Sequence, residues 1–432
     1  MTDNNVAWVA EGSIPPSPPP AGETGPIRWA RENLFLGPVN SVITIVASIF
    51  ITWGVLALLQ WAVFDAVVNA SSLAECREVN PHGACWAVIV ERFDQFLFGF
   101  YPEELRWRPS LAFALLLVAL YFALTDNAPF RAQGLIFAGV YPLIAFFLIW
   151  GGPILSVLAF AAGITILFAA VIYGGRFIPT AFALPIGAVA AVAWLLFIPG
   201  LFASSPGVDF VGPGLEEVES RQLGGFLLAL IIGVAGIVLS LPIGVLLALG
   251  RRSGLFFIQT LCVVFIEFIR GVPLITLLFV ANSVLAYFFP PGSSLDLILR
   301  VVIMVTMFAS AYMAEVIRGG LAALPSGQQE AADSLGLDYW KSIRLIIMPQ
   351  ALKISIPNIV STFIGLFKDT TLVVVIGLLD PIGLISAIRG DSNWNGIVWE
   401  FYVFVGAFFF VVCFAMSRYS QYLERKLATD HR

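Results

Sequence analysis

Long apolar runs separated by short polar intervals dominate this chain. An α-helix needs about 20 mainly apolar residues to cross the hydrocarbon layer of a membrane, and most of the runs approach or exceed that length. Of the 432 residues, 59% are apolar and 12% are charged, whereas a soluble domain has about 45–50% and about 25%. The sequence therefore predicts an all-α polytopic membrane protein.

We expect about ten membrane-spanning helices. The expected spans cover residues 41–64, 109–124, 135–150, 154–173, 179–201, 223–249, 256–288, 297–317, 354–379 and 398–416. The second and third have marginal length. An even number of crossings places both ends of the chain on the same side.

The polar intervals divide the chain into four expected parts. These are a proline-rich tail with an interfacial segment (1–40), a membrane extension of about five helices with an outer loop at 65–108 (41–201), an outer linker (202–222) and a second membrane domain (223–432). The linker is rich in Ser, Pro, Gly and Glu, and turn-forming residues of this kind favour a solvated loop. We expect the domain boundary there.

The loop at 65–108 contains two of the four cysteines, Cys76 and Cys85, and a helical pattern. Apolar residues recur at helical spacing between Trp86 and Phe100, with charged residues between them. This pattern fits a helix lying on a membrane surface and the buried face of a small subdomain equally well. Cys262 and Cys413 lie within apolar spans, where we expect them to be packing residues.

Basic residues are distributed unequally across the predicted topology. The side that holds both termini carries fourteen Lys and Arg residues, and the opposite side carries seven. By the positive-inside rule, the richer side is cytoplasmic. Cys76 and Cys85 then face an oxidising compartment, where close cysteine pairs usually bridge, so we expect a disulfide.

A polar island at 325–349, PSGQQEAADSLGLDYWKSIRLIIMP, lies between two apolar runs. Ser326 and Gln329 have the spacing of a capping box, which begins a helix. Gly336 is suited to end that helix, because glycine readily takes the left-handed conformation. Asp338 can cap a second short helix, which Pro349 should end. The predicted topology places this helical hairpin in the cytoplasm.

The spacing within the island resembles the EAA loop of ABC-importer permeases. The matching positions are Glu330, Ala331, Ala332, Gly336, Met348 and Pro349, with Met348 where the family usually has leucine. The stretches FIEFIRGVPLITLLF, AYMAEVIRGG and FKDTTLV resemble the polar amino-acid permease family. The resemblance covers about half of the chain, residues 221–425, and gives the loop the bounds 319–350.

The two halves of the chain carry separate resemblances. The C-terminal five helices resemble the core of a type I ABC-importer permease. The N-terminal half, with Cys76, Cys85 and GACWAVIVERFDQFLFGFYP, is similar to the larger permease subunit of general L-amino-acid or glutamate/glutamine/aspartate/asparagine uptake systems. What the N-terminal five helices do is left open.

These resemblances imply a permease subunit that imports polar L-amino acids across a bacterial inner membrane. The loop would dock as a coupling helix on a cytoplasmic ATPase dimer, which would hold ATP and Mg²⁺. Glu330 would make polar contacts, Ala331 and Ala332 would allow close approach, and Gly336 would make the turn. An external binding protein and a second permease subunit would complete the assembly. The resemblance favours a related chain as the second permease, and a second copy of this chain is the alternative.

We expect this chain to be no enzyme and to bind no cofactor itself. A phosphate-binding P-loop has Gly before its Lys, and the four lysines each follow another residue type: Lys341, Lys353, Lys368 and Lys426. The two histidines, His82 and His431, lie far apart in sequence, which disfavours a metal centre. The net charge of −5 disfavours a nucleic-acid partner. A secondary transporter or channel that works without an ATPase is the alternative class, although no repeat of the EAA-like loop is seen.

Ionisable residues within apolar spans are candidates for a substrate path, because a charge at mid-bilayer costs roughly 2.5–3.5 kcal/mol or more. The candidates are Glu267, Arg270, Lys368, Asp369, Thr370 and Thr371. If both spans begin at the cytoplasmic surface, Arg270 and Lys368 each lie roughly 21 Å above it and could share one site for a zwitterion. Alternatively, Glu267 and Arg270 neutralise each other, as do Lys368 and Asp369, and the two pairs only hold helices together. We expect Glu315 and Arg318 to pair near the inner interface.

Overall fold

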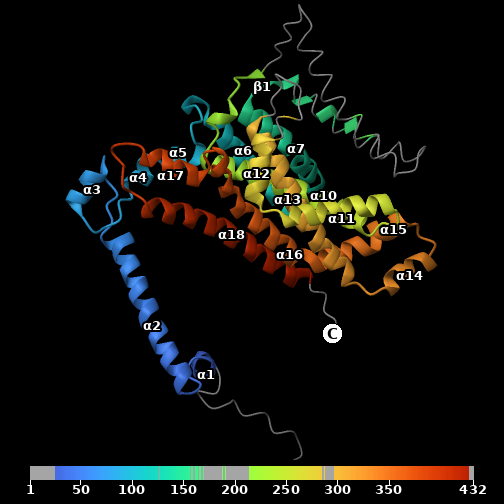
Figure 1. Cartoon of the computed structure of the whole chain (residues 1–432), viewed down its shortest axis with the longest axis horizontal. Coiled ribbons are helices and arrows are strands. Elements are labelled where there is room, and N and C mark those ends of the chain that lie inside the picture. Colours follow the sequence, from blue (N-terminus) through green and yellow to red (C-terminus); the bar gives the residue numbers. More distant parts are fainter. Residues whose placement is uncertain are drawn as a thin grey trace, which may run out of the picture. The chain divides into compact units, whose positions relative to one another are not determined.

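The computed structural model describes residues 25–125, 127–155, scattered positions between 157 and 190, 214–284, 287 and 296–427. Its regular elements are almost all helices (Figure 1). By length and composition, seven described helices can cross a membrane, or eight if the bent pair α11–α12 forms one span. The expected all-α membrane architecture is confirmed. The spans expected at 154–173 and 179–201 lie largely outside the described residues.

The chain divides into two compact units, Met1–Ala87 and Val88–Arg432. In the first unit, α1 (Pro26–Asn33) and α2 (Pro38–Leu59) each begin with a proline, whose fixed φ suits the first helical turn. α2 continues into a π-helical turn, η1 (Gln60–Phe64), so the span expected at 41–64 is present. α3 (Leu73–Val79) follows, capped by the hydroxyl of Ser72.

The second unit begins with short helices and a helical pair. These elements are α4 (Ala87–Glu91), α5 (Phe93–Phe98), η2 (Glu103–Leu105), α6 (Trp107–Leu124) and α7 (Arg131–Trp150). Val88 and Phe96 are fully buried. Of the apolar residues in the pattern between 86 and 100, Ile89 is buried as well, whereas Val90, Phe93 and Phe100 are exposed, and the pattern is divided between α4 and α5. Tyr141 donates a hydrogen bond to the carbonyl of Ala112 and ties α7 to α6.

Three glycines allow backbone segments of the second unit to meet. Gly225 has a φ of +60°, and a Cβ there would lie 2.0 Å from the carbonyl oxygen of Phe96. Gly99 has a φ of +70°, and its Cβ would lie 2.5 Å from Cα of Gly224. The N–H of Gly225 donates to the carbonyl of Leu379. Only residues without a side chain permit this approach. We call Gly99, Gly224 and Gly225 the glycine junction.

The centre of the second unit is built on α10 (Gly225–Arg251) and α13 (Leu297–Ala322), which run parallel, and α16 (Met348–Asp369), which runs the opposite way. The contacts that fix these directions are Gly236 with Val305, Gly244 with Met313, Gly320 with Ser355 and Gly236 with Leu366. Glycine at each contact lets the helices approach closely. α18 (Trp399–Leu427) packs beside α16.

Shorter elements connect these helices, and one expected span is broken into two of them. The short elements are β1 (Gly152–Pro153) paired with β2 (Gly214–Leu215), η3 (Ser220–Gln222), α11 (Phe256–Gly271), α12 (Leu274–Ser283), α14 (Gly327–Ser334), α15 (Tyr339–Ser342), η5 (Ile343–Ile347), η6 (Thr370–Ile376) and α17 (Pro381–Arg389). The span expected at 256–288 is α11 and α12, which meet at 103°. Val272 lies before Pro273 and has an extended backbone, because the residue before proline avoids the helical conformation.

Pro349 does not end a helix, contrary to the expectation. The helical path is continuous from Tyr339 to Ile376, so the span expected at 354–379 begins well before residue 354. Pro349 lies in the first turn of α16, directly after the π-helical turn η5. Proline has no N–H to donate to the preceding turn, and the π-helical turn η5 changes the hydrogen-bond pattern there, so the helical path continues through Pro349.

Candidate functional site

The polar island folds as a helical hairpin between α13 and α16. α14 ends at Leu335, and Gly336 takes a left-handed φ of +71°. The N–H of Leu337 donates to the carbonyl of Ala332, which closes the turn. Asp338 accepts a hydrogen bond from the N–H of Lys341 and so caps α15. This bond holds the pKa of Asp338 below its ordinary value. We call residues 327–347 the hairpin.

The expected capping box at the start of α14 does not form. Ser326 takes helical dihedral angles, and its hydroxyl accepts no capping bond. Gln329 uses its side chain inside the hairpin instead, because its Nε2 donates to Asp333 and its Oε1 accepts from the hydroxyl of Ser342. The Gln329 amide thus joins α14 to α15.

The hairpin exposes charged and apolar side chains together. Glu330 and Ala331 are exposed, whereas Ala332 is fully buried. Four large, mainly apolar side chains are exposed as well: Leu335 (77%), Tyr339 (47%), Trp340 (54%) and Leu345 (64%). Apolar exposure to water is typical of a surface that binds another protein, and of these side chains Leu335 lies outside the membrane-length helical path that begins at Tyr339. Figure 1 shows the hairpin helices α14 and α15 at the opposite end of the second unit from α17.

The base of the hairpin is anchored in an apolar core that reaches into the membrane helices. Ile343, Ile347 and Met348 are buried in this core. Its other buried members include Ala248 of α10, Ile266 of α11, Ala314, Ile317 and Leu321 of α13, and Ala351 of α16. A displacement of the hairpin would therefore act on α10, α11, α13 and α16 through direct packing.

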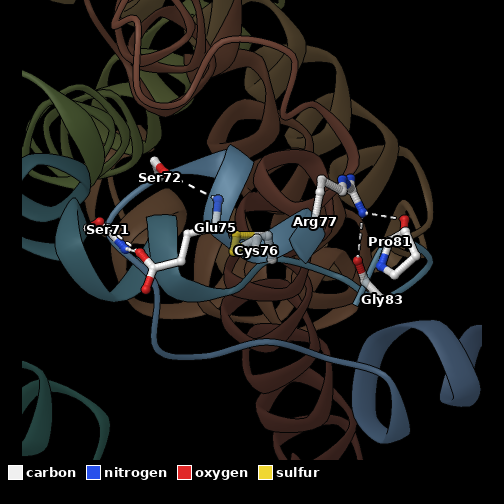
Figure 2. The surroundings of a disulfide bond; sticks show 8 residues. Ser71, Ser72, Glu75, Cys76, Arg77, Pro81 and Gly83 are labelled. Atoms are coloured by element: carbon white, nitrogen blue, oxygen red, sulfur yellow. Dashed lines mark hydrogen bonds between the residues drawn. A yellow bond between two sulfur atoms is a disulfide. The ribbon is translucent and has the colours of Figure 1, made fainter. Parts of the chain in front are cut away.

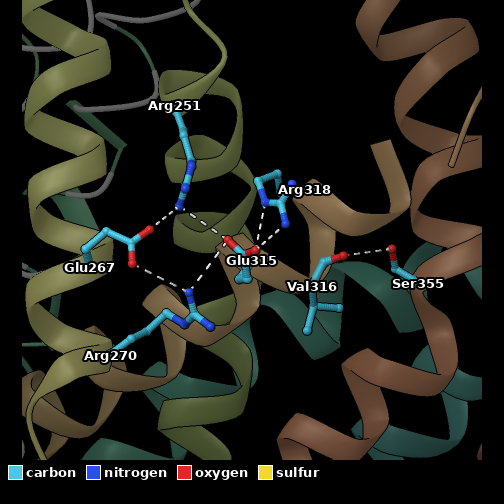
Figure 3. A network of polar contacts seen from close by, with 7 residues as sticks. All are labelled: Arg251, Glu267, Arg270, Glu315, Val316, Arg318 and Ser355. Atoms are coloured by element: carbon cyan, nitrogen blue, oxygen red, sulfur yellow. Dashed lines mark hydrogen bonds and ion pairs between the residues drawn. The ribbon is translucent and has the colours of Figure 1, made fainter. Parts of the chain in front are cut away.

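Five charged residues from three helices form a cluster beside this core (Figure 3). We call Arg251 of α10, Glu267 and Arg270 of α11, and Glu315 and Arg318 of α13 the ion cluster. Nη1 of Arg251 lies 2.8 Å from Glu267 and 3.3 Å from Glu315. Nη1 of Arg270 lies 3.8 Å from Glu315 and 4.0 Å from Glu267. Arg318 donates to Glu315 through Nε at 2.8 Å and through Nη2.

Arg270 and Lys368 do not share the depth that the sequence suggested. Arg270 contacts Glu315 and Tyr312, next to Met313, which faces Gly244 of α10. Phe367, next to Lys368, faces Gly233. From Gly233 to Gly244, α10 rises about 16 Å. The two groups of candidate residues therefore lie at different levels. The expectation placed the start of the second span near residue 354, whereas the helical path to Lys368 begins at Tyr339.

The second group of candidates lies at the far end of α16. Lys368 is exposed, and its ammonium group makes no hydrogen bond or ion pair with any residue that the structure describes. Asp369 is partly buried beside it. The hydroxyls of Thr370 and Thr371 donate to the carbonyls of Phe367 and Lys368. Lys368 is thus the candidate cation that keeps its binding capacity, whereas Arg270 is engaged by two glutamates.

Cys76 and Cys85 are joined by a disulfide in the first unit (Figure 2). Around it, Arg77 donates to the carbonyls of Pro81 and Gly83. The N–H and hydroxyl of Ser71 donate to Glu75 and hold its pKa below the ordinary value. Cys262 and Cys413 are free. Within the described part of the chain, no group of three or more His, Cys, Asp or Glu side chains could hold a metal ion.

Comparison with known proteins decides the family. Residues 240–429 match the model of the binding-protein-dependent transport system inner membrane component family. The chain is 52% identical to the glutamate/glutamine/aspartate/asparagine transport system permease protein BztC of Rhodobacter capsulatus, over 99% of this chain and 100% of that protein. This chain belongs to the family of binding-protein-dependent transport permeases. It is also 40% identical to the inner membrane amino-acid ABC transporter permease protein YhdY of Escherichia coli, over 96% of this chain and 97% of that protein.

Shorter members of the permease family match only part of this chain. The probable glutamine ABC transporter permease protein GlnP of Bacillus subtilis is 33% identical over 217 residues, which are 50% of this chain and 98% of that protein. A nearly complete short permease therefore corresponds to half of the present one. BztC and YhdY, in contrast, extend over almost the whole chain.

Sequence reasoning on this permease missed Arg251 and underrated Glu315. Arg251 is 64 positions from Glu315, and α10, α11 and α13 must pack before the ion cluster exists. The available signal was the placement of Arg251 at the end of an apolar run, with Glu267 and Glu315 inside the neighbouring runs. A charged residue within an apolar run indicates that it has an oppositely charged partner, but the sequence does not show which residue that partner is.

Proposed function

We propose that this chain is the permease subunit of an ABC importer that moves polar L-amino acids across the inner membrane. The observation that carries this proposal is the full-length similarity to BztC, a glutamate/glutamine/aspartate/asparagine transport permease. The similarity to YhdY, an amino-acid permease, supports the substrate class. The chain conducts the substrate, and the chemistry of ATP, with Mg²⁺, takes place on separate subunits.

The hairpin is the element that contacts a cytoplasmic ATPase dimer. Its exposed Glu330 and Ala331, the turn at Gly336 and the exposed Leu335 offer a compact surface at one end of the second unit. Met348 and Pro349 connect this surface to α16. Since the base of the hairpin packs against α10, α11 and α13, a docked ATPase would move the membrane helices when it closes.

The permease core is residues 223–432, and its coupling loop is residues 319–350. The match of the family model to 240–429 supports this division, as does the correspondence of half the chain to GlnP. Residues 41–201 are then a membrane extension with its outer loop at 65–108, residues 202–222 an outer linker, and residues 1–40 a cytoplasmic tail with an interfacial segment. The alignment with BztC over 99% of the chain supports an extension common to larger permeases.

Both termini lie in the cytoplasm of a bacterium, and the loop with Cys76 and Cys85 lies outside. The unequal distribution of basic residues supports this orientation, and the disulfide agrees with an oxidising compartment. Mass spectrometry of the permease purified without reductant should find the two cysteines linked. Two free thiols would argue against the outward placement of the loop.

The substrate path includes Lys368, Asp369, Thr370 and Thr371, with Glu267 and Arg270 nearer the cytoplasmic end. Lys368 is the cation proposed to bind the substrate carboxylate, because it is exposed without an ion-pair partner among the described residues. The hydroxyl of Thr371 and the carboxylate of Asp369 offer acceptors for the ammonium group, whereas Thr370 is fully buried. Glu267 and Arg270 line the exit only if the ion cluster opens.

An external binding protein and a second permease complete the assembly. One chain supplies one hairpin, whereas a dimer of ATPase subunits offers two docking grooves. A related chain or a second copy supplies the other hairpin. Affinity purification of the tagged permease from its native membrane should recover an ATPase and a second permease. Recovery of this chain alone, together with amino-acid movement down an ion gradient in proteoliposomes, would establish a secondary transporter instead.

A further inference from the structure

Glu315 is the hub of the ion cluster. Its carboxylate contacts three guanidinium groups, which come from Arg251, Arg270 and Arg318 (Figure 3). Arg251 belongs to α10 and Arg270 to α11, so a single side chain of α13 connects the three helices. Glu267 contacts two of the same arginines but adds no further helix. Removal of Glu315 would thus separate α13 from the cluster, whereas removal of Glu267 would not.

The hub lies where α13 approaches the hairpin. Glu315 is about 10 Å along the helix from Ala322, the last residue of α13. Its neighbours Ala314 and Ile317, and Ile266 beside Glu267, lie in the apolar core that also holds Ile343 and Ile347 of the hairpin. The ion cluster and the base of the hairpin therefore share one packed layer.

α11 contributes one buried side chain, Ile266, to this apolar core. It has 16 residues and bends 103° away from α12. Its outward face is apolar and exposed, with Phe256 81% and Phe257 75% accessible. Apolar packing is non-directional, whereas charge-assisted hydrogen bonds fix both distance and orientation. Arg251 donates hydrogen bonds to Glu267 of α11 and to Glu315 of α13, and these bonds hold α11 at its angle to α13.

We propose that Glu315 is a positioning residue that carries displacement of the hairpin to α11, and through it to the broken span α11–α12. This inference rests on the proposed coupling function of the hairpin. When the hairpin moves, α13 moves with it through the shared apolar core. Glu315 then moves Arg251 and Arg270, so that α10, α11 and α13 turn as one rigid group.

The test uses the complete transporter, with its ATPase, second permease and binding protein, in proteoliposomes. The readout is the amount of amino acid imported per ATP hydrolysed. Glu315→Gln should lower this ratio about fivefold or more, the usual lower range of an allosteric coupling. Glu103→Gln is a matched control, because Glu103 also pairs with an arginine three positions on, Arg106, but lies far from the hairpin in sequence. That control should keep the ratio.

A double variant separates positioning from simple stabilisation. The cluster has three arginines and two glutamates, and Glu315→Gln with Arg318→Gln keeps the same net charge. If Glu315 only neutralises charge, this double variant should recover both the thermal stability and the import ratio. Positioning predicts recovery of the thermal stability with the import ratio still low. If Glu315→Gln does not assemble, the import ratio measured for the double variant alone tests the positioning role.

The outcomes are distinct. A wild-type ratio in Glu315→Gln, or recovery of the ratio in the double variant, would overturn the positioning role while leaving the proposed importer intact. Absence of ATP-driven uptake by the wild-type assembly would overturn the proposed function, and the inference with it. A low ratio in both variants, with normal stability in the double variant, is the result we expect.

Discussion

The glycine junction and the hairpin both depend on glycines with positive φ, but they place them in opposite surroundings. At the junction, a Cβ on Gly225 would meet the backbone of Phe96 at 2.0 Å. At the hairpin turn, a Cβ on Gly336 would meet nothing within 4 Å. Gly225 is required because two backbone segments pack closely there, whereas Gly336 is required only because the exposed turn has a left-handed backbone. Substitutions should therefore damage folding at the junction and function at the hairpin.

The largest effect is expected at the junction. Gly225→Val would combine a strained left-handed backbone with a clash against Phe96, and should cost roughly 3 kcal/mol or more. We expect little folded permease in the membrane, measured by thermal unfolding in detergent and by yield. Gly139→Val, at a helical glycine with open space around it, is the control. Normal yield and stability of Gly225→Val would mean that the junction is looser than described.

Loss of transport with an intact fold is expected at the hairpin. Glu330→Arg reverses an exposed charge and should keep normal thermal stability. Gly336→Val meets no neighbouring atom but strains the left-handed turn by about 1–2 kcal/mol, so it should also insert and assemble, with a small loss of thermal stability. Both should abolish ATP hydrolysis stimulated by the binding protein, because the docking surface is changed. ATPase assays in proteoliposomes measure this. Full ATP-driven uptake by either variant would contradict the assignment of the hairpin as the coupling element.

A smaller effect is expected at Lys368. Lys368→Ala should weaken uptake of all substrates about tenfold or more, the effect of a lost charge-assisted hydrogen bond of about 1.5–3 kcal/mol. Stability should not change, because Lys368 has no ion-pair partner among the described residues. Lys368→Arg should restore part of the uptake. Arg270→Ala, in contrast, should lower thermal stability as well, because it leaves Glu267 and Glu315 with fewer partners.

At Asp380 we expect a change in the pH dependence of stability. This carboxylate is fully buried and accepts from the N–H groups of Ile382 and Gly383 at the start of α17. Burial raises its pKa from 3.8 to about 6. The folded chain therefore binds more protons than the unfolded chain between about pH 4 and pH 6, so stability falls as pH rises through this window and the cost is complete above it. Asp380→Asn should flatten the thermal stability between pH 5 and pH 7, whereas Glu104→Gln, at an exposed site, should not. An unchanged slope in Asp380→Asn would assign the pH dependence to another group.

Local chemistry predicted much of the hairpin. The turn at Gly336 and the cap at Asp338 follow from the residues themselves and are present. The prediction of a capping box at Ser326 was wrong, because the side chain of Gln329 bonds to Asp333 and Ser342 instead. Residue spacing within one helix does not show that a side chain will bond to a second helix. Hydropathy predicted the membrane helices, but not the break before Pro273 or the long path from Tyr339 to Ile376.

The sequence did not predict which side chains of different helices would contact each other. The depth argument for Arg270 and Lys368 assumed that the second span begins near residue 354, whereas the helical path begins at Tyr339. Glu315 was expected to pair with Arg318, which it does, but Arg251 and Arg270 reach it only after three helices have packed. Such partners depend on crossing angles that no local pattern encodes.

The central claim is that the hairpin of an active transporter contacts the ATPase. A photo-reactive amino acid at position 335, where the side chain is 77% exposed, tests it directly in the native membrane. The same group at position 79, which is 67% exposed in the disulfide-bonded loop, is the control. We expect position 335 to cross-link to the ATPase subunit and position 79 not to do so. An active transporter in which position 335 yields no cross-link to an ATPase would contradict the claim.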